Sequence, residues 1–152
     1  MKKKFLTKII VLASLTLTTL TLANAQSDSR ARNVVVNLYR DAKTKNIAKW
    51  GKVELKKYFD DELAEAIYKV THSENGIDFD VLYYAQDTQI KSFRIGEAEL
   101  QSPSLATVEV SFSNFGKKEE IQFLMASYGK MGWKITEVYY ADGMLTKILS
   151  AD

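Results

Sequence analysis

The spacing of apolar residues changes once along this chain, and the change limits the folds open to it. In the first half apolar residues recur three and four positions apart, whereas from Gln89 onward they alternate with polar residues. The first spacing is typical of helices that bury one face, and alternation is typical of strands with one buried face. The turn-forming pair Asn75-Gly76 ends the helical half. The sequence therefore predicts helices first and a sheet second.

The helical half predicts three helices. An amphipathic helix is expected over residues 31 to 47, a short helix before Asp60, and another helix from there to about Thr71. The run Asp60-Asp61-Glu62 supports a helix that begins there, because negative charge is favoured at a helix N-terminus. The apolar residues at helical spacing are Val35, Leu38, Tyr39, Ala42, Leu55, Tyr58, Phe59, Leu63, Ala66, Ile67 and Val70.

The second half predicts two consecutive hairpins. The segments 114–116 and 129–132 contain the glycines that tight connections between strands need. The apolar parity slips between Ile135 and Val138, which indicates either a bulge or a strand covered on both faces. After Asp142-Gly143 a terminal helical turn is favoured over another strand. The alternating apolar residues are Ala106, Val108, Val110, Phe112, Ile121, Phe123 and Met125, followed by the aromatic-rich run 133–140.

This order of elements predicts an α+β fold, with N-terminal helices packed on the concave face of a curved antiparallel sheet. It resembles the cone-shaped fold of the nuclear transport factor family, also described as cystatin-like. A narrower resemblance, to an uncharacterised family of bacterial envelope proteins known as domain of unknown function 3828, covers the chain from the first helix to the end. The residues that carry it are Asp80, Ala85-Gln86-Asp87, Trp133-Lys134-Ile135, Tyr139-Tyr140-Ala141-Asp142-Gly143 and Leu145. The resemblance implies a fold more than a function.

Residues 1–25 have the pattern of a secretory signal peptide. Four lysines precede an apolar run over residues 9–22, and Ala23-Asn24-Ala25 supplies small residues at the cleavage site. A run of this length is shorter than the roughly 20 residues of a permanent membrane helix. We expect cleavage before Gln26, a single α+β domain over 26–152, and a periplasmic or secreted location without a stable membrane anchor.

Removal of the leader changes the charge of the chain. The full sequence has 21 basic and 19 acidic residues, and the leader holds four of the lysines, which leaves 17 against 19. A weakly acidic domain lacks the many cationic contacts on which nucleic-acid binding depends, so no nucleic-acid partner is expected. The chain has no cysteine, and therefore neither an acylated anchor nor disulfides.

Catalytic residues are sparse. His72 is the only histidine and falls at the end of a predicted helix, where capping is its favoured role. As a general base it would need an orienting carboxylate, which Asp78, Asp80 or Asp87 could supply. These carboxylates lack the spacing of a calcium loop, and one histidine without cysteine makes a poor zinc site. We expect no metal and no cofactor.

Two sets of residues are candidates for binding. Phe115, at a predicted hairpin tip, and the acidic loop of Glu74, Asp78 and Asp80 could contact a protein partner. Alternatively, Phe115 folds back onto the sheet and the acidic residues form a solvated surface. An aromatic set could line a pocket for apolar ligands or, as we favour, fill the core. That set comprises Tyr83, Tyr84, Trp133 and Tyr139, with Phe93 and Tyr140.

Three functions follow from these observations. We rank first an exported, non-catalytic protein-binding module of the bacterial envelope, in its sharper form an inhibitor or immunity protein against an enzyme that acts in the periplasm. A small apolar ligand bound in the concave pocket ranks second. An enzyme that uses His72 with an aspartate ranks third.

Overall fold

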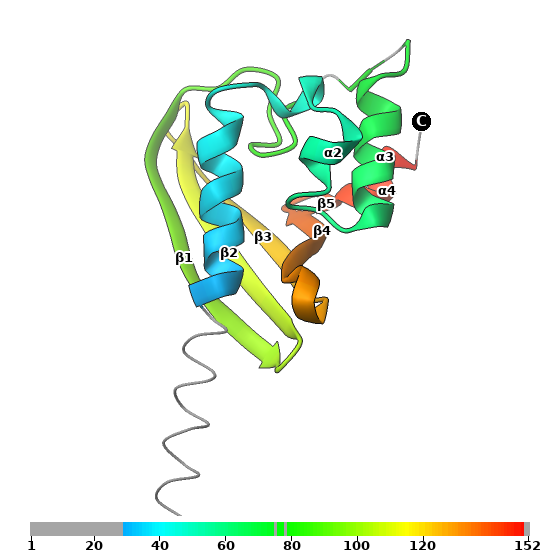
Figure 1. Ribbon diagram of the computed structural model, residues 1–152. Helices are drawn as coiled ribbons and strands as arrows, with labels where there is room; N and C mark the ends of the chain where they lie inside the picture. Colours follow the sequence, from blue (N-terminus) through cyan, green and yellow to red (C-terminus); the bar gives the residue numbers. More distant parts are fainter. Residues whose placement is uncertain (1–28, 75, 78, 151–152) are drawn as a thin grey trace, which may run out of the picture.

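The computed structural model describes residues 29–74, 76–77 and 79–150. The predicted α+β class is confirmed: N-terminal helices contact a five-stranded antiparallel sheet, and a short helix follows it. Figure 1 shows the N-terminal helix lying along the curved sheet, with α2 and α3 beside it. The predicted leader lies outside the described residues. Within the described part of the chain, no helix is long and apolar enough to cross a membrane.

The N-terminal helix is shorter than the sequence pattern predicts. Residues 29–42 are helical, and a face containing Val35, Leu38 and Tyr39 is buried against the sheet. The predicted end at residue 47 is wrong, because the helix stops at residue 42 and a separate 3-10 helix begins at residue 47. The Asn46 side chain accepts a hydrogen bond from the Ala48 amide at 2.8 Å and caps the 3-10 helix η1 (Ile47–Lys49).

The predicted break at Asp60 is confirmed. The short helix α2 (Lys52–Leu55) precedes it, and α3 (Asp61–Thr71) follows. The Asp60 carboxylate accepts a hydrogen bond from the Leu63 amide at 2.9 Å and so caps α3. The buried face of α3 consists of Leu63, Ala64, Ile67 and Val70.

The strands pair in the order of the sequence, and both predicted hairpins are confirmed. The strands are β1 (Ile90–Ser102), β2 (Leu105–Asn114), β3 (Lys117–Ser127), β4 (Trp133–Tyr140) and β5 (Gly143–Met144). The β3–β4 connection contains the 3-10 helix η2 (Gly129–Met131). Of the two alternatives for the slip of parity, the bulge is present: Met125 pairs with Ile135 while Leu124 pairs with Glu137, which leaves one extra residue on β4.

Next to the bulge, the buried carboxylate of Glu137 forms hydrogen bonds with the segment that follows β5. Glu137 accepts hydrogen bonds from the Val138 amide at 2.9 Å and the Thr146 amide at 3.2 Å, and also one from the Thr146 hydroxyl. These bonds hold the start of α4 (Leu145–Leu149), the terminal helical turn that the sequence predicts. A buried carboxylate is tolerated here because several donors surround it.

The helical half is joined to the outer edge of β4 through backbone hydrogen bonds. The Asp60 amide donates to the Ile135 carbonyl at 2.9 Å, and the Ile135 amide donates to the Tyr58 carbonyl at 2.8 Å. The Lys134 ammonium also donates to the carbonyls of Lys56 and Lys57, at 2.6 and 2.9 Å. An edge paired in this way is closed to other strands at that point.

The loop between α3 and β1 inserts two apolar side chains into the core. Val81 and Leu82 are fully buried, in a segment without regular structure. Their carbonyls would be costly to bury alone, but the Tyr140 hydroxyl donates to the Val81 carbonyl and the Tyr39 hydroxyl to the Leu82 carbonyl, each at 2.7 Å. The loop is therefore part of the core, and we name residues 80–85 the core loop.

We predict that Leu82→Ala lowers the free energy of unfolding by about 2–5 kcal/mol, because it leaves a cavity beneath the core loop. The matched control is Val53→Ala, at a position that is 79% exposed, where the change should stay within about 0.5 kcal/mol. Urea denaturation of both variants measures this difference. Equal effects would show that the core loop does not belong to the folding core.

Candidate functional site

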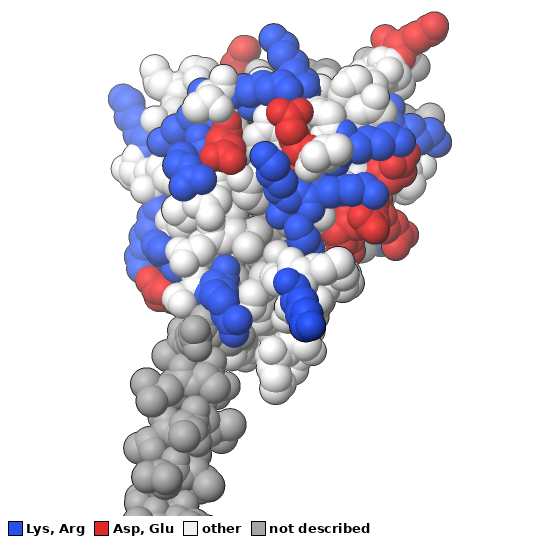
Figure 2. Space-filling model, in the orientation of Figure 1, with Lys and Arg blue, Asp and Glu red and all other residues white. Residues whose placement is uncertain are grey.

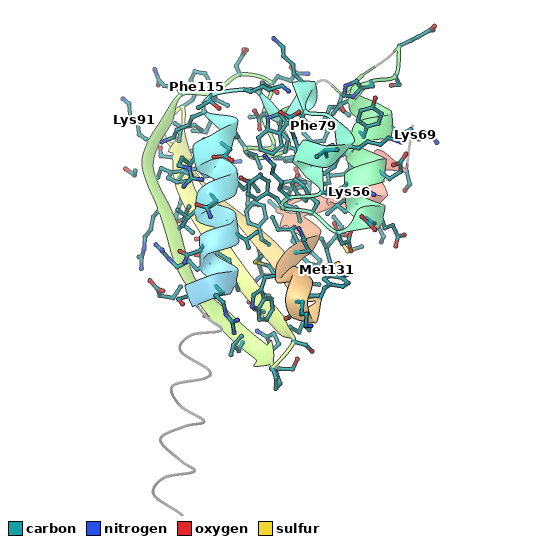
Figure 3. All side chains as sticks on the ribbon, in the orientation of Figure 1. Lys56, Lys69, Phe79, Lys91, Phe115 and Met131 are labelled. Atoms are coloured by element: carbon teal, nitrogen blue, oxygen red, sulfur yellow. The ribbon has the colours of Figure 1, made fainter. Side chains whose placement is uncertain are left out.

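The tip of the β2–β3 hairpin carries an exposed aromatic side chain on a strained backbone. Asn114 pairs with Lys117, so the turn consists of Phe115 and Gly116 alone, with φ of 48° and 84°. Two positive φ angles define a turn in which asparagine and glycine are usual, because a side chain at the first position is sterically disfavoured. Phe115 is nevertheless 63% exposed, and Figure 3 shows it at one end of the sheet.

Hydrogen bonds to the segment before β1 hold the hairpin tip in place. The Asn114 side chain accepts a hydrogen bond from the Gln89 amide at 2.8 Å and donates to the Asp87 carbonyl at 3.4 Å. Asp87 therefore contributes its backbone to this end of the sheet. Because these bonds connect the tip to the segment before β1, Phe115 projects from a fixed support.

His72 lies at the C-terminal end of α3, where the sequence places it. Its Nδ1 atom is 3.1 Å from the Tyr68 carbonyl, and its ring stacks on the Tyr68 ring at a centroid distance of 4.1 Å. Among the described residues, neither Asp80 nor Asp87 is bonded to His72, and Asp78 falls outside them. The contacts of His72 are those of a helix-capping residue.

The acidic candidates do not form one described cluster. Glu74 is exposed beyond the end of α3, whereas Asp80 is half-buried at the start of the core loop. The Asp80 carboxylate accepts a hydrogen bond from the Leu82 amide at 2.7 Å. Burial raises the pKa of Asp80, and the backbone amides of Leu82 and Tyr83 partly offset that rise. Asp80 thus supports the core loop from within.

The aromatic candidates divide between the core and the surface. Trp133 is buried at 5% exposure, and Tyr83 makes edge contacts with the rings of Tyr39 and Phe112. Tyr84 stacks on Tyr140 at 4.3 Å. A hollow of about 200 Å³ is lined by Tyr83, Tyr84, Asn114, Lys117, Glu119, Glu120, Ile121, Tyr140, Ala141 and Asp142. Tyr139 lines a more open hollow beside it, of about 560 Å³, among the charged side chains of β3.

Sequence reasoning missed an apolar hollow at the opposite end of β3. Its volume is about 580 Å³, and Phe59, Tyr128 and Met131 line it together with the acidic start of α3. Met131 is 72% exposed. The signal available in the sequence was the pair of large apolar residues flanking a glycine turn. No group of three or more potential metal-ligating side chains occurs in the described ranges.

Sequence reasoning also missed a local excess of positive charge. Residues 40–57 contain seven Lys or Arg and two acidic residues, although the net charge after removal of the leader is slightly negative. Figure 2 shows Lys and Arg predominating over the end of the N-terminal helix and over α2. The net charge of the whole chain does not reveal the local positive charge of residues 40–57.

Comparisons with known proteins add no relative. A scan against family models and searches among curated proteins and solved structures found no match to this chain. The fold class is an α+β domain with helices on an antiparallel sheet. Membership of the envelope-protein family remains a prediction from the residues quoted for it.

The pKa of Asp80 leads to a prediction about stability. In the unfolded chain this carboxyl ionises near 3.8, whereas the folded chain retains the proton to higher pH. The contribution of Asp80 to the free energy of unfolding should therefore fall as pH rises from 3.8 through the raised pKa, and then level off.

Asp80→Asn keeps the acceptor for the Leu82 amide and removes the titration. Chemical denaturation of both proteins across acidic pH measures the effect. The wild-type value minus the variant value should decline with rising pH, and a difference that is flat or increases would contradict the burial of this carboxyl.

Proposed function

We propose that the chain is an exported, non-catalytic protein-binding module that contacts its partner through the β2–β3 hairpin tip. The observation that carries this proposal is Phe115, which is 63% exposed and has a φ of 48°. Export is supported by the signal-peptide pattern of residues 1–25.

Phe115 has a backbone conformation that is costly for its residue type, and its side chain gains little burial in return. A left-handed backbone at a residue other than glycine costs about 1–2 kcal/mol, and the ring remains largely in water. Residues in strained conformations persist where the surrounding structure enforces them, and they concentrate at functional sites. Burial of this ring against a partner would return about 1.5–3 kcal/mol.

The surroundings of Phe115 suit a contact residue at the centre of an interface. The ring stands on a hairpin pinned by Asn114, so little conformational entropy is lost on binding. Lys117 and Lys118 beside it are exposed and pair with Glu119 and Glu120 at 3.0 and 2.6 Å. An aromatic anchor with a polar rim is the usual anatomy of a binding hot spot.

The finer forms of this proposal come from the sequence. The motifs quoted above support membership of the envelope-protein family and a cone-shaped, cystatin-like sheet. An exported domain without an evident catalytic set supports an inhibitor or immunity protein that blocks an enzyme in the periplasm. Glu74, Asp78 and Asp80 stay candidates for further contacts of the same partner.

The two alternatives have less support. Ligand pockets usually have volumes of about 300–1,000 Å³, whereas the hollow at Tyr83 and Tyr84 has about 200 Å³. The larger hollows at Tyr139 and at Phe59 and Met131 fall within that range, and five charged residues line each of them. An enzyme would need a partner for His72, and the described contacts of His72 are with Tyr68 and Thr71.

We predict that Phe115→Asn separates stability from binding. Asparagine suits the turn, so the free energy of unfolding should rise by about 1 kcal/mol. Affinity for the partner should fall by more than about tenfold. Residues 26–152 would be used to capture envelope and secreted proteins, with the partner identified by mass spectrometry and its affinity measured by calorimetry.

Met131→Asn is the matched control, because it removes another exposed apolar side chain at the opposite end of β3. It should leave the affinity unchanged. Equal affinity of the Phe115 variant and the wild type, or a loss confined to the Met131 variant, would contradict the proposed contact surface.

A further inference from the structure

The positive charge of this protein is concentrated in one short segment. We name residues 40–57 the basic segment. It has seven Lys or Arg against two acidic residues, while the rest of 26–152 has ten against seventeen. All six of its lysines are exposed, and Figure 2 shows Lys and Arg predominating over the end of the N-terminal helix and over α2. A solvated surface without a partner does not require such segregation.

Both acidic residues of the basic segment make hydrogen bonds that hold it in place. The Asp41 carboxylate accepts a hydrogen bond from the Tyr58 hydroxyl. Burial and this hydrogen bond raise the pKa of Tyr58 to about 12. The Glu54 carboxylate accepts one from the Gly51 amide at 2.7 Å and pairs with Lys45. The segment is thus a fixed support for its lysines.

Three lysines of the basic segment have no ion pair in the described part of the chain. Lys45, Lys52 and Lys56 pair with Glu54, Glu65 and Asp61 respectively, at 2.6–3.0 Å. Lys43, Lys49 and Lys57 are not within ion-pair distance of any described carboxylate. The charges of Lys43 and Lys49 are available to an external anion. Lys57 also helps to lower the pKa of Asp41 and Glu54 through its positive charge, but neither carboxylate pairs with it directly.

An apolar side chain stands among these lysines. Val53 is 79% exposed on α2. The helical turn continues beyond α2, since the Lys56 amide donates to the Lys52 carbonyl at 2.9 Å and the Lys57 amide to the Glu54 carbonyl at 3.3 Å. Positions three and four residues apart are neighbours on a helix surface, so Lys56 and Lys57 lie beside Val53.

We propose that the basic segment docks residues 26–152 on an anionic phospholipid surface. The lysines meet the headgroup phosphates, and Val53 reaches the boundary of the acyl chains. Amphipathic segments bind membrane surfaces by this combination of cationic and apolar contacts. Flexible lysines and one small apolar side chain are sufficient contacts for a lipid surface, which does not need a shaped cavity in the protein.

Other anionic partners fit the same surface less well. The aromatic ring of the segment, Trp50, and that of the adjoining Tyr58 are buried, so the segment offers no platform on which the bases of a nucleic acid could stack. A protein hot spot is usually built on an exposed aromatic or Arg anchor. The one arginine of the segment, Arg40, already pairs with Asp41 at 3.1 Å, and its most exposed apolar side chain is Val53. Acidic side chains farther than about 8–10 Å from the membrane are screened by salt.

The first test is binding to vesicles. Each lysine near an anionic membrane strengthens binding by about fivefold. Residues 26–152 should sediment with vesicles of mixed phosphatidylcholine and phosphatidylglycerol but not with phosphatidylcholine alone. The triple variant Lys43→Gln, Lys49→Gln and Lys57→Gln should lose binding by about 100-fold. Circular dichroism confirms that each variant is folded.

The matched control is the triple variant Lys91→Gln, Lys130→Gln and Lys147→Gln, which changes the net charge equally at exposed lysines outside the segment. Its binding should change by less than about threefold, because those lysines do not belong to the basic segment. The proposal would be overturned if the protein did not bind anionic vesicles, or if both triple variants lost binding equally. It would also be overturned if the protein bound an immobilised acidic polypeptide but not the vesicles.

The second test places a probe at Val53. Because the chain has no cysteine, Val53→Cys can carry a single dye whose fluorescence rises in an apolar environment. The signal at position 53 should increase with anionic vesicles, and the same dye at Glu109→Cys on β2 should not respond. A bound protein with an unchanged signal at 53 would contradict docking through this surface.

Discussion

The structure depends on the burial of the core loop between the N-terminal helix and the sheet. An irregular backbone can enter a core only if its polar groups find partners. Two tyrosine hydroxyls, from Tyr39 on the N-terminal helix and Tyr140 on β4, provide them at 2.7 Å for the carbonyls of Leu82 and Val81. These bonds connect the helical layer, the loop and the sheet, and they place the side chains of Val81 and Leu82 in the core between them.

A filled interior leaves the ends and faces of the molecule as places for function. The hairpin tip with Phe115 and the apolar hollow with Met131 lie at opposite ends of β3, about 33 Å apart at the usual rise of a strand. The basic segment lies on the helical side. The surfaces proposed for a partner and for a membrane are therefore separate, and occupation of one need not obstruct the other.

The sequence predicted those features that depend on neighbouring residues. Periodicity located α3 and the strands β2, β3 and β4, and the acidic run located the break at Asp60. The slip of parity indicated a bulge or a strand covered on both faces, and β4 has the bulge. The sequence analysis placed no separate strand at β1. The core loop was not predicted, because its bonds join Leu82 to a tyrosine 43 residues earlier and Val81 to one 59 residues later. The strain at Phe115 was equally hidden, since only backbone angles reveal it. The basic segment was visible in the sequence but was lost in the average charge.

The central claim is that Phe115 meets a protein partner, and the most direct measurement is site-specific photo-crosslinking. A photoreactive amino acid at position 115, in residues 26–152 mixed with envelope and secreted proteins, should form one dominant adduct with a single protein. The same group at position 109 on β2 should not form that adduct. No adduct at 115, or identical adducts at both positions, would contradict the account.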